Sequence, residues 1–378
     1  MTEGAQRPRG PVPPIPFTLL TGFLGSGKTT LLNKLLSDPA LKDTAVIINE
    51  FGDVALDHLM VERIDDEMMV LSSGCLCCTL RGDLVTALEK LLRGLDNGRV
   101  SFRRVVIETT GLADPAPILQ TAMSHPYLVM RFRLDGVVTL VDAVNGLSTL
   151  DEHREAVKQA AVADRLVLTK TDLLDTPKRI ATKDQLIARL RELNPAAPIL
   201  DAAKGDATPA RVLECGLYKS GEKIPDVNAW LAEEAYAAAH DHDHHHHHDV
   251  TRHDDRVRSF SLATDKAIPA AVLDLFLELL RSMHGPNLLR MKGIVKIEET
   301  PDTPVVIHGV QHVLHPPARL DQWPDGDYRS RLVFIVRDIE PRVVSELFDA
   351  FLGTPAPGRP DMAALADNPL VPFGGRDR

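Results

Sequence analysis

The chain is poor in cysteine and has no excess of positive charge. Its 378 residues include 4 Cys, and 53 acidic side chains outnumber 43 basic ones for a formal net charge of −10. Three cysteines stand together at Cys75, Cys77 and Cys78 while Cys215 stands alone, which is not the spacing of a disulfide framework. The acidic balance and the lack of a basic stripe argue against nucleic acid or an anionic membrane surface as the partner.

Long apolar runs are also missing. No run approaches the ~20 residues of a membrane span, and the N-terminus, "MTEGAQRPRGPVPPIPF", contains no apolar signal region. We therefore expect a cytoplasmic protein with reduced thiols and no membrane partner. The 44% hydrophobic content is enough for real cores, and the length fits two domains of ~100–200 residues each.

Short apolar runs alternate with helical stretches from residue 15 onward. The strand-like runs are "IPFTLL", "TAVIINEFG", "RRVVIETTG", "DGVVTLVDA", "RLVLTKTD" and "APILDAAKG", and the helical ones include "DLVTALEKLLRGL" and "TKDQLIARLRELN". This alternation predicts an α/β domain over residues 15–220, with a parallel sheet covered by helices on both faces.

The composition divides the rest of the chain. Residues 1–14 are predicted to be a disordered leader, and residues 221–256 a polar His/Asp-rich linker around "AHDHDHHHHHDVTRHDD". Residues 257–355 predict a smaller α+β domain, with strands at "VRSFSLAT", "MKGIVKIEE", "TPVVIHGVQHVLH" and "SRLVFIVRD" and helices at "AVLDLFLELLRSM" and "PRVVSELFDAFLG". Residues 356–378 are predicted to be a tail.

A phosphate-binding loop follows the first strand. Gly22, Gly27, Lys28 and Thr29 satisfy G-x-x-x-x-G-K-[ST], between an apolar strand and the helical "TLLNKLLSD". This pattern predicts a P-loop NTPase in which backbone N–H groups hold phosphates, Lys28 reaches the terminal phosphates and Thr29 ligates Mg²⁺. The predicted nucleotide-binding set from this loop also includes Gly25, Ser26 and Thr30.

Two later strand ends carry further candidates. Glu108 ends the strand in "VVIETTG" and is expected to act in catalysis near Mg²⁺, and Gly111 is placed to sense the γ-phosphate. "LTKTD" is similar to the N-K-x-D guanine-binding motif of GTPases, so we expect Asp172 to accept hydrogen bonds from guanine and the Lys170 stem to pack on the base. Thr169 stands where that motif has Asn. Residues 201–205 are placed to complete the base pocket.

The clustered cysteines allow two interpretations. Thiolates favour Zn²⁺ and other borderline or soft ions, and three of them supply most of a tetrahedral shell, with one position left to a carboxylate, a His or water. The alternative is a redox-active or merely buried cysteine cluster.

Four motifs in order carry a resemblance to a known family. "GFLGSGKTT", "NEFGD", "GCLCC" and "ETTGLADP" resemble the CobW family of P-loop GTPases, relatives of HypB and UreG, and "LLRMKGIVKIEE" and "SRLVFIV" resemble its C-terminal domain. The resemblance implies a GTPase that delivers zinc or cobalt to a client protein. It also implies Cys75, Cys77 and Cys78 as metal ligands, and Glu50 and Asp53 as switch-region carboxylates near the metal or Mg²⁺. Asp53 stands where members commonly have Glu.

We therefore expect a GTP-hydrolysing metallochaperone that uses GTP, Mg²⁺ and Zn²⁺ or Co²⁺. The alternatives are a nucleotide-binding switch that senses oxidation and a small-molecule kinase on the same fold, and a homodimer is left open. The linker histidines predict a weak metal reservoir or a solvated tether; they are His240, His242, residues 244–248 and His253. In the second domain, His308 and His312 are expected on one face of a strand and His315 on the other, either as metal ligands or as surface histidines.

Overall fold

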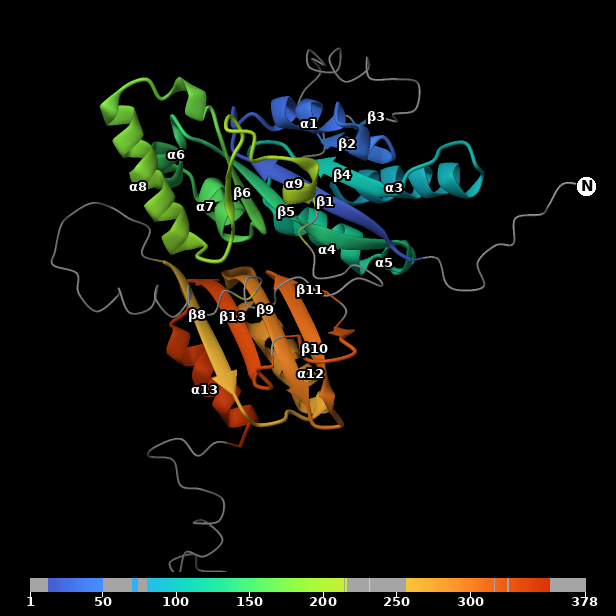
Figure 1. The fold of residues 1–378 in the computed structure, drawn as a ribbon. Helices are drawn as coiled ribbons and strands as arrows, with labels where there is room; N and C mark the ends of the chain where they lie inside the picture. Colours follow the sequence, from blue (N-terminus) through green and yellow to red (C-terminus); the bar gives the residue numbers. More distant parts are fainter. Residues whose placement is uncertain are drawn as a thin grey trace, which may run out of the picture.

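A computed structural model of the chain describes residues 13–49, 70–73, 80–213, 215, 231, 256–315, 317–324 and 326–353. Figure 1 shows two sheets, one formed by the blue-to-green half of the chain and the other by the yellow-to-red half. The predicted leader, linker and tail fall almost entirely outside the described residues, so the predicted domain limits stay predictions.

The first sheet has seven described strands in the order β3-β2-β4-β1-β5-β6-β7, and every pairing is parallel. In chain order the strands are β1 (Ile15–Gly22), β2 (Thr44–Asn49), β3 (Val70–Ser73), β4 (Arg104–Glu108), β5 (Phe132–Asp142), β6 (Arg165–Thr169) and β7 (Ile199–Asp201). The inner strands are apolar over most of their length because helices bury both of their faces.

Two hydrophobic clusters lie on opposite faces of this sheet. Leu19 and Ile107 pack with α3 (Leu80–Asp96) and α4 (Pro115–Ser124), whereas Leu20 and Val106 pack with α1 (Lys28–Leu36) and α9 (Pro209–Leu213). The remaining helices in the described part of this domain are α5 (Pro126–Arg131), α6 (Gly146–Glu152), α7 (Arg154–Ala161) and α8 (Pro177–Leu193), with 3₁₀ turns η1 (Pro39–Leu41) and η2 (Thr171–Leu173). The predicted parallel sheet with helices on both faces is confirmed.

The second sheet is antiparallel, in the order β11-β10-β9-β13-β8, with β12 paired to β10. Its elements are β8 (Val257–Thr264), α12 (Ala270–His284), η4 (Gly285–Asn287), β9 (Leu288–Ile297), β10 (Thr300–Val310), β11 (Val313–Leu314), β12 (Ala318–Arg319), β13 (Ser330–Arg337) and α13 (Pro341–Phe351). Phe276 of α12 and Phe348 of α13 pack in one core with the strand residues Phe260 and Phe334. The predicted α+β domain is confirmed.

The strand predicted across residues 303–315 is wrong in one respect. The chain turns at Gln311, whose φ is 51°, and returns as β11 instead of continuing as one strand. The backbone N–H of His315 donates to the carbonyl oxygen of His308, and the two imidazole rings stack with centroids 4.6 Å apart. His315 therefore lies beside His308 and not on the opposite face, because a hairpin reverses the alternation that a single strand would give.

A buried ionic cluster joins the two sheets. The Asp164 carboxylate, just before β6, is 2% exposed and pairs with Arg290 and Lys292, which are both on β9. The Nζ atom of Lys292 lies 3.3 Å from Asp164 Oδ1. Arg290 also donates to the carbonyl oxygen of Val162 and contacts His308 Nε2 at 3.0 Å. The second Asp164 oxygen accepts the backbone N–H of Val137 at 3.0 Å. Because a buried carboxylate needs partners of opposite charge, this cluster fixes how the domains meet.

The pKa values of the acid, the lysine and the two histidines in this cluster are all lowered. Burial alone would raise the pKa of Asp164, but Arg290 and Lys292 outweigh it and lower that pKa. Burial and the neighbouring Arg290 lower the pKa of Lys292 to about 8 and that of His315 to about 4. Burial, His315 and Arg290 also lower the pKa of His308 well below its usual value. The two stacked imidazoles are therefore neutral near pH 7.

This arrangement predicts that acid weakens the fold before the carboxylates titrate. Between pH 6.5 and about 4, the unfolded chain binds a proton at residue 315 that the folded chain excludes, so the free energy of unfolding falls as pH falls. The loss from this group between pH 7 and pH 5 is on the order of 2 kcal/mol. Urea denaturation of parent and His315→Gln at both pH values measures it: the variant should lose less stability. His312→Gln, in the same turn but outside the stacked pair, is the control and should behave as the parent; equal losses in all three proteins would contradict the prediction.

Candidate functional site

The P-loop residues 22–29 wrap around the amino end of α1. Gly22 has φ 144° and Gly27 has φ 86°, conformations that L side chains rarely adopt. A Cβ atom at Gly22 would lie 2.5 Å from the carbonyl oxygen of Leu140, so only glycine fits there. Gly27 is the N-cap of α1. The loop therefore directs backbone N–H groups and the helix N-terminus toward one place, which suits an anion such as phosphate.

Lys28 lies across this loop. Its ammonium group donates to the carbonyl oxygens of Gly22 at 2.9 Å and Phe23 at 3.2 Å. The side chain is thus held over the loop, where a bound nucleotide would place its terminal phosphates.

Thr29 and Glu108 meet at the edge of the sheet. The Thr29 hydroxyl donates to Glu108 Oε1 at 3.0 Å, and Glu108 is 3% exposed at the end of β4. A hydroxyl and a carboxylate side by side offer the oxygen ligands that Mg²⁺ prefers. The pair predicted from two distant motifs is therefore in contact, and its chemistry fits a magnesium ion beside the P-loop.

Gly111 packs directly on the P-loop. A Cβ atom at Gly111 would lie 2.6 Å from the backbone nitrogen of Leu24, so no side chain fits between the two segments. The Gln159 amide of α7 donates to the carbonyl oxygens of Gly111 at 3.2 Å and Ala113 at 3.0 Å. Gln159 is 1% exposed. The position expected to sense a γ-phosphate is thus held against the phosphate-binding loop.

Thr169, the last residue of β6, contacts the P-loop. Its hydroxyl donates to the carbonyl oxygen of Ser26 at 2.8 Å, and its side chain is the nearest neighbour of a Cβ atom placed on Gly27. Although Thr169 departs from the N-K-x-D motif, it still connects β6 to the loop. A threonine at this position thus hydrogen-bonds to the P-loop.

The predicted base-binding residues lie at the ends of β6 and β7. Asp172 is exposed in η2, and the Thr171 hydroxyl donates to Asp201 Oδ1 at 2.5 Å, which ties this turn to residues 201–205. The Lys170 ammonium contacts Asp142 Oδ2 at 2.7 Å. Burial by itself would raise the pKa of Asp142, but hydrogen bonds from Lys170 and from the Val144 and Asn145 amides lower it. Asp142 is therefore a carboxylate that orients Lys170.

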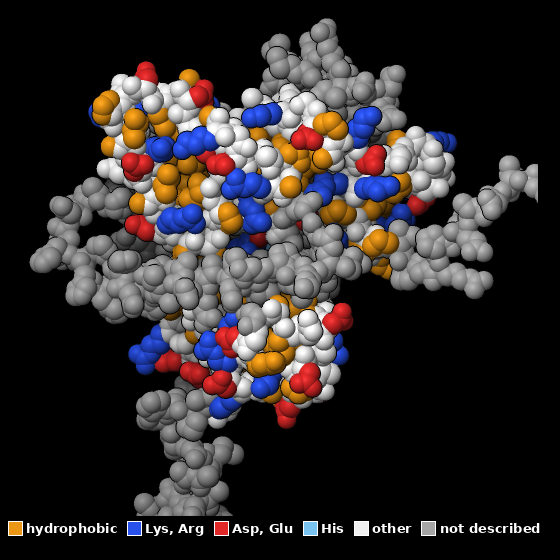
Figure 2. Space-filling view, viewed as in Figure 1, with side chains coloured by type: hydrophobic (Ala, Val, Ile, Leu, Met, Phe, Trp, Pro, Cys, Tyr) orange, Lys and Arg blue, Asp and Glu red, His pale blue; other side chains and the backbone are white. Residues whose placement is uncertain are grey.

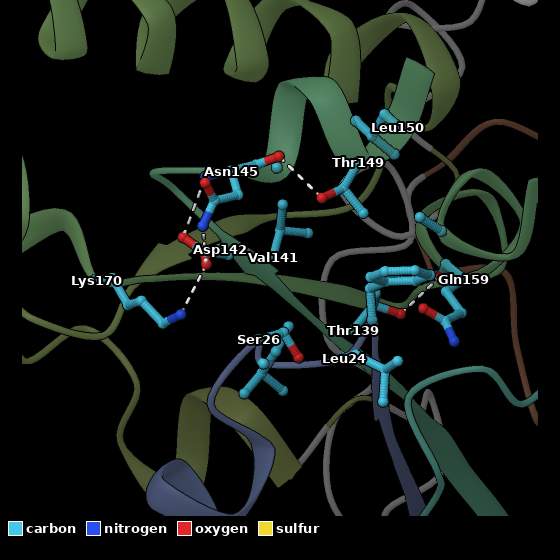
Figure 3. A pocket seen from close by; sticks show the side chains of 15 residues that line it. Leu24, Ser26, Thr139, Val141, Asp142, Asn145, Thr149, Leu150, Gln159 and Lys170 are labelled. Atoms are coloured by element: carbon cyan, nitrogen blue, oxygen red, sulfur yellow. Dashed lines mark hydrogen bonds and ion pairs between the residues drawn. The ribbon is translucent and has the colours of Figure 1, made fainter. Parts of the chain in front are cut away.

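A cavity of about 190 Å³ adjoins the P-loop, between the carboxyl end of β5 and helices α6 and α7. Figure 3 shows Ser26, Thr139, Asp142, Gln159 and Lys170 around it. Ser26 Oγ and Gln159 Oε1 are buried without a hydrogen-bond partner among the described residues. The sequence did not predict roles for Gln159 and Asp142 or the hydrogen bond of Thr169. A polar residue on the buried face of α7, between Ala156 and Ala160, is the one signal that could have identified Gln159.

The predicted metal ligands Glu50, Asp53, Cys75, Cys77 and Cys78 and the linker histidines lie outside the described residues. Within the part of the chain that the structure describes, no three His, Cys, Asp or Glu side chains are grouped to hold a metal ion. None of the described helices is long and apolar enough to cross a bilayer. On the face in Figure 2, Lys and Arg side chains are interspersed with Asp and Glu.

Two known families match successive parts of the chain. Residues 16–201 match the family described as CobW/HypB/UreG, nucleotide-binding domain, and residues 257–352 match the family described as cobalamin synthesis protein CobW C-terminal domain. These ranges cover both sheets except for Ile15, the first residue of β1.

Individual relatives match over nearly all or about half of their length. The zinc chaperone YjiA of Escherichia coli is 35% identical over 323 residues, which are 85% of this chain and 94% of YjiA. A crystal structure of Zn(II)-bound YjiA GTPase from E. coli has a TM-score of 0.65 and 29% identity, covering 90% of this chain and 99% of that one. The zinc-regulated GTPase metalloprotein activator 1 of Schizosaccharomyces pombe is 37% identical over 199 residues, 51% of this chain and 46% of that protein.

The Thr169 contact gives a testable prediction about the P-loop. Thr169→Val keeps the branched shape but leaves the Ser26 carbonyl without its donor, so nucleoside triphosphate should bind with about 1 kcal/mol less free energy, a Kd about fivefold weaker. Thr169→Ser retains the hydroxyl and should bind as the parent does. Calorimetric titration measures both, and parent-like affinity in Thr169→Val would show that this hydrogen bond does not support the loop.

Proposed function

The chain belongs to the CobW/HypB/UreG family, and on that basis we propose that it is a GTP-hydrolysing metallochaperone that carries zinc to a client protein. The names of its relatives, a zinc chaperone and a zinc-regulated GTPase metalloprotein activator, support a GTPase that handles zinc. We assign the zinc ligands to Cys75, Cys77 and Cys78, whose thiolates suit this ion.

The observation that carries the proposal is where three neighbouring strands end. β2 and β3 end in register at Asn49 and Ser73, and β4 ends beside them at Glu108. Neighbouring strands lie about 4.8 Å apart, so the end of β3 is about 10 Å from the Thr29–Glu108 pair. The sequence continues directly from these ends to Glu50 and to Cys75. The P-loop and the segment that leads into the proposed metal-binding motif thus start from the same edge of one sheet, which supports coupling between nucleotide and metal.

Hydrolysis is assigned to the P-loop side of this edge. Lys28 is placed to neutralise negative charge that develops on the transferred phosphate, and the backbone N–H groups of the loop hold the other phosphates. Thr29 and Glu108 would hold Mg²⁺, which supplies further positive charge at the phosphates. Gly111, which touches Leu24, is the backbone group that would respond to the presence of the γ-phosphate.

We propose that nucleotide controls the affinity for zinc. Binding of GTP would bring the thiolates of Cys75, Cys77 and Cys78 together with the carboxylates of Glu50 and Asp53, and hydrolysis would weaken the site and release the metal. Linkage requires the reverse effect, so bound zinc changes GTP affinity by the same factor. The histidine tract at residues 240–253 would supply weakly bound metal, and the C-terminal domain would contact the client. Cobalt as cargo, dimerisation and a cytoplasmic location stay predictions.

The cysteine assignment is tested by Cys77→Ser combined with Cys78→Ser. Hydroxyls stay protonated near neutral pH and bind Zn²⁺ or Co²⁺ poorly, so tight metal binding should be lost while GTP still binds. Co²⁺ is a useful probe, since its thiolate charge-transfer absorption reports sulfur ligands. In the parent, a non-hydrolysable GTP analogue with Mg²⁺ should strengthen Co²⁺ binding, and in the double variant this dependence should vanish.

Cys215→Ser is the matched control for loss of a thiol. Burial raises the pKa of the Cys215 thiol far above its usual range, so it is protonated and no metal ligand at neutral pH. This variant should keep the absorption. Charge-transfer absorption that survives in the double variant, or that ignores nucleotide in the parent, would refute the chaperone mechanism and favour a redox function for these cysteines.

The choice of GTP over ATP is tested at Asp172. Asp172→Asn replaces two acceptors by one acceptor and one donor, which cannot match the two N–H groups of guanine. The preference for GTP should fall by about tenfold, measured as the ratio of Kd values for GTP and ATP analogues. Asp175→Asn, at an exposed aspartate of the same loop, should leave the ratio unchanged. An unaltered ratio in Asp172→Asn would assign base recognition to other residues.

A further inference from the structure

Asp114 connects the nucleotide site to the C-terminal sheet. It follows Gly111 by three residues and caps α4 by accepting the backbone N–H of Ala116. The same carboxylate accepts a 2.8 Å contact from Lys158 Nζ on α7. Gln311 Nε2, from the turn between β10 and β11, lies 3.4 Å and 3.5 Å from its two oxygens. One side chain thus contacts three elements, one of which belongs to the other domain.

The Gln311 turn is built to present this amide. Gln311 is 5% exposed and has φ 51°, a left-handed conformation that favours glycine or asparagine over a long side chain. Its own N–H donates to the Leu289 carbonyl oxygen, and a Cβ atom at Gly285 would lie only 3.1 Å from the Cβ of His312. The turn is therefore held on two sides by the C-terminal domain while its amide contacts the nucleotide-binding domain.

Helix α7 provides a second connection along the same route. Its neighbouring residues Lys158 and Gln159 contact Asp114 and the carbonyl oxygens of Gly111 and Ala113. Just beyond its carboxyl end, the Val162 carbonyl oxygen accepts a hydrogen bond from Arg290 of β9. Gln159 of the helix is thus hydrogen-bonded to Gly111, which packs on the P-loop, and Val162, just past the end of the helix, is hydrogen-bonded to the C-terminal sheet.

A shift at Gly111 cannot be absorbed locally. Gly111 has no space toward Leu24, and residues 110–113 form a hydrogen-bonded turn in which the Ala113 N–H donates to the Thr110 carbonyl oxygen. Displacement of Gly111 therefore moves Asp114. Because Asp114 is bonded to Lys158 and near Gln311, the movement passes to α7 and to the β10–β11 turn.

We propose that the C-terminal domain responds to the nucleotide state of the GTP site through Asp114, with Lys158 and Gln311 as positioning residues. The inference rests on the proposed function, because it needs GTP and GDP to hold Gly111 differently. It assigns the regulation of client contact to the contacts of Asp114 with Lys158 and Gln311. The β10–β11 hairpin is then the part of the C-terminal domain that senses hydrolysis.

Hydrogen–deuterium exchange of the full chain with GDP and with a non-hydrolysable GTP analogue tests the proposal. In the parent, amides of residues 108–114 and of residues 305–314 should exchange at different rates with the two nucleotides. Gln311→Asn keeps an amide that tolerates the left-handed backbone but is one methylene too short to contact Asp114. It should abolish the nucleotide dependence at residues 305–314 and retain it at residues 108–114. Gln322→Asn makes the same change at an exposed site and should match the parent.

Lys158→Met removes the contact between α7 and Asp114. It tests the same coupling from the nucleotide-binding domain, and it replaces Gln311→Asn as the test if that variant does not fold. It should also reduce the nucleotide dependence at residues 305–314. A merely structural role would raise exchange equally with both nucleotides and leave the difference intact, and that result would overturn the proposal. A parent in which residues 108–114 respond and residues 305–314 do not would also overturn it while leaving the GTPase intact. Failure to bind the GTP analogue would instead refute the proposed function, and the inference with it.

Discussion

Every pairing in the N-terminal sheet is parallel, so the strands all end at the same edge, and this constraint assembles the candidate site. The P-loop leaves β1 there, Glu108 ends β4, Asp142 ends β5 and Thr169 ends β6. Residues separated by more than a hundred positions thereby come within hydrogen-bond distance, as Thr169 and Ser26 do. The site needs no long loops to gather its groups, since the carboxyl edge of a parallel sheet already places them together.

The second constraint is the charge at Asp164. A carboxylate buried at this depth is stable only with cations and hydrogen-bond donors around it, and here both cations come from β9 of the other domain. The ionic cluster fixes the orientation of the two sheets, and the neighbouring Asp114 contacts depend on that orientation. The stacked histidines lie against the same arginine, so their neutral state belongs to the same electrostatic arrangement.

The sequence was sufficient for features that depend on contiguous motifs or strong periodicity. The P-loop, the strand ending at Glu108, the parallel sheet and the α+β class of the second domain followed from local patterns and agree with the structure. Gln159, the Thr169 hydrogen bond and the Asp164 cluster depend on contacts between distant segments, which no local pattern encodes. The hairpin at Gln311 was missed because its turn lacks the glycine or asparagine that a positive φ usually requires. Glu50, Asp53 and the three clustered cysteines lie outside the described residues and stay predictions.

The origin of the charges around Asp164 also bears on how such a chain can change over generations. The nucleotide-binding half supplies the anion and the C-terminal half supplies both cations. The buried charges of each half are therefore stabilised by charges of the other half. A recombination event that joined this first half to a C-terminal domain with neutral residues at positions 290 and 292 would bury a carboxylate without its cations. A domain with cations there but no facing acid would have the opposite defect. The two halves therefore form an electrostatically matched pair, and substitution on the outer surface of the second domain would disturb this pairing less than exchange of that domain.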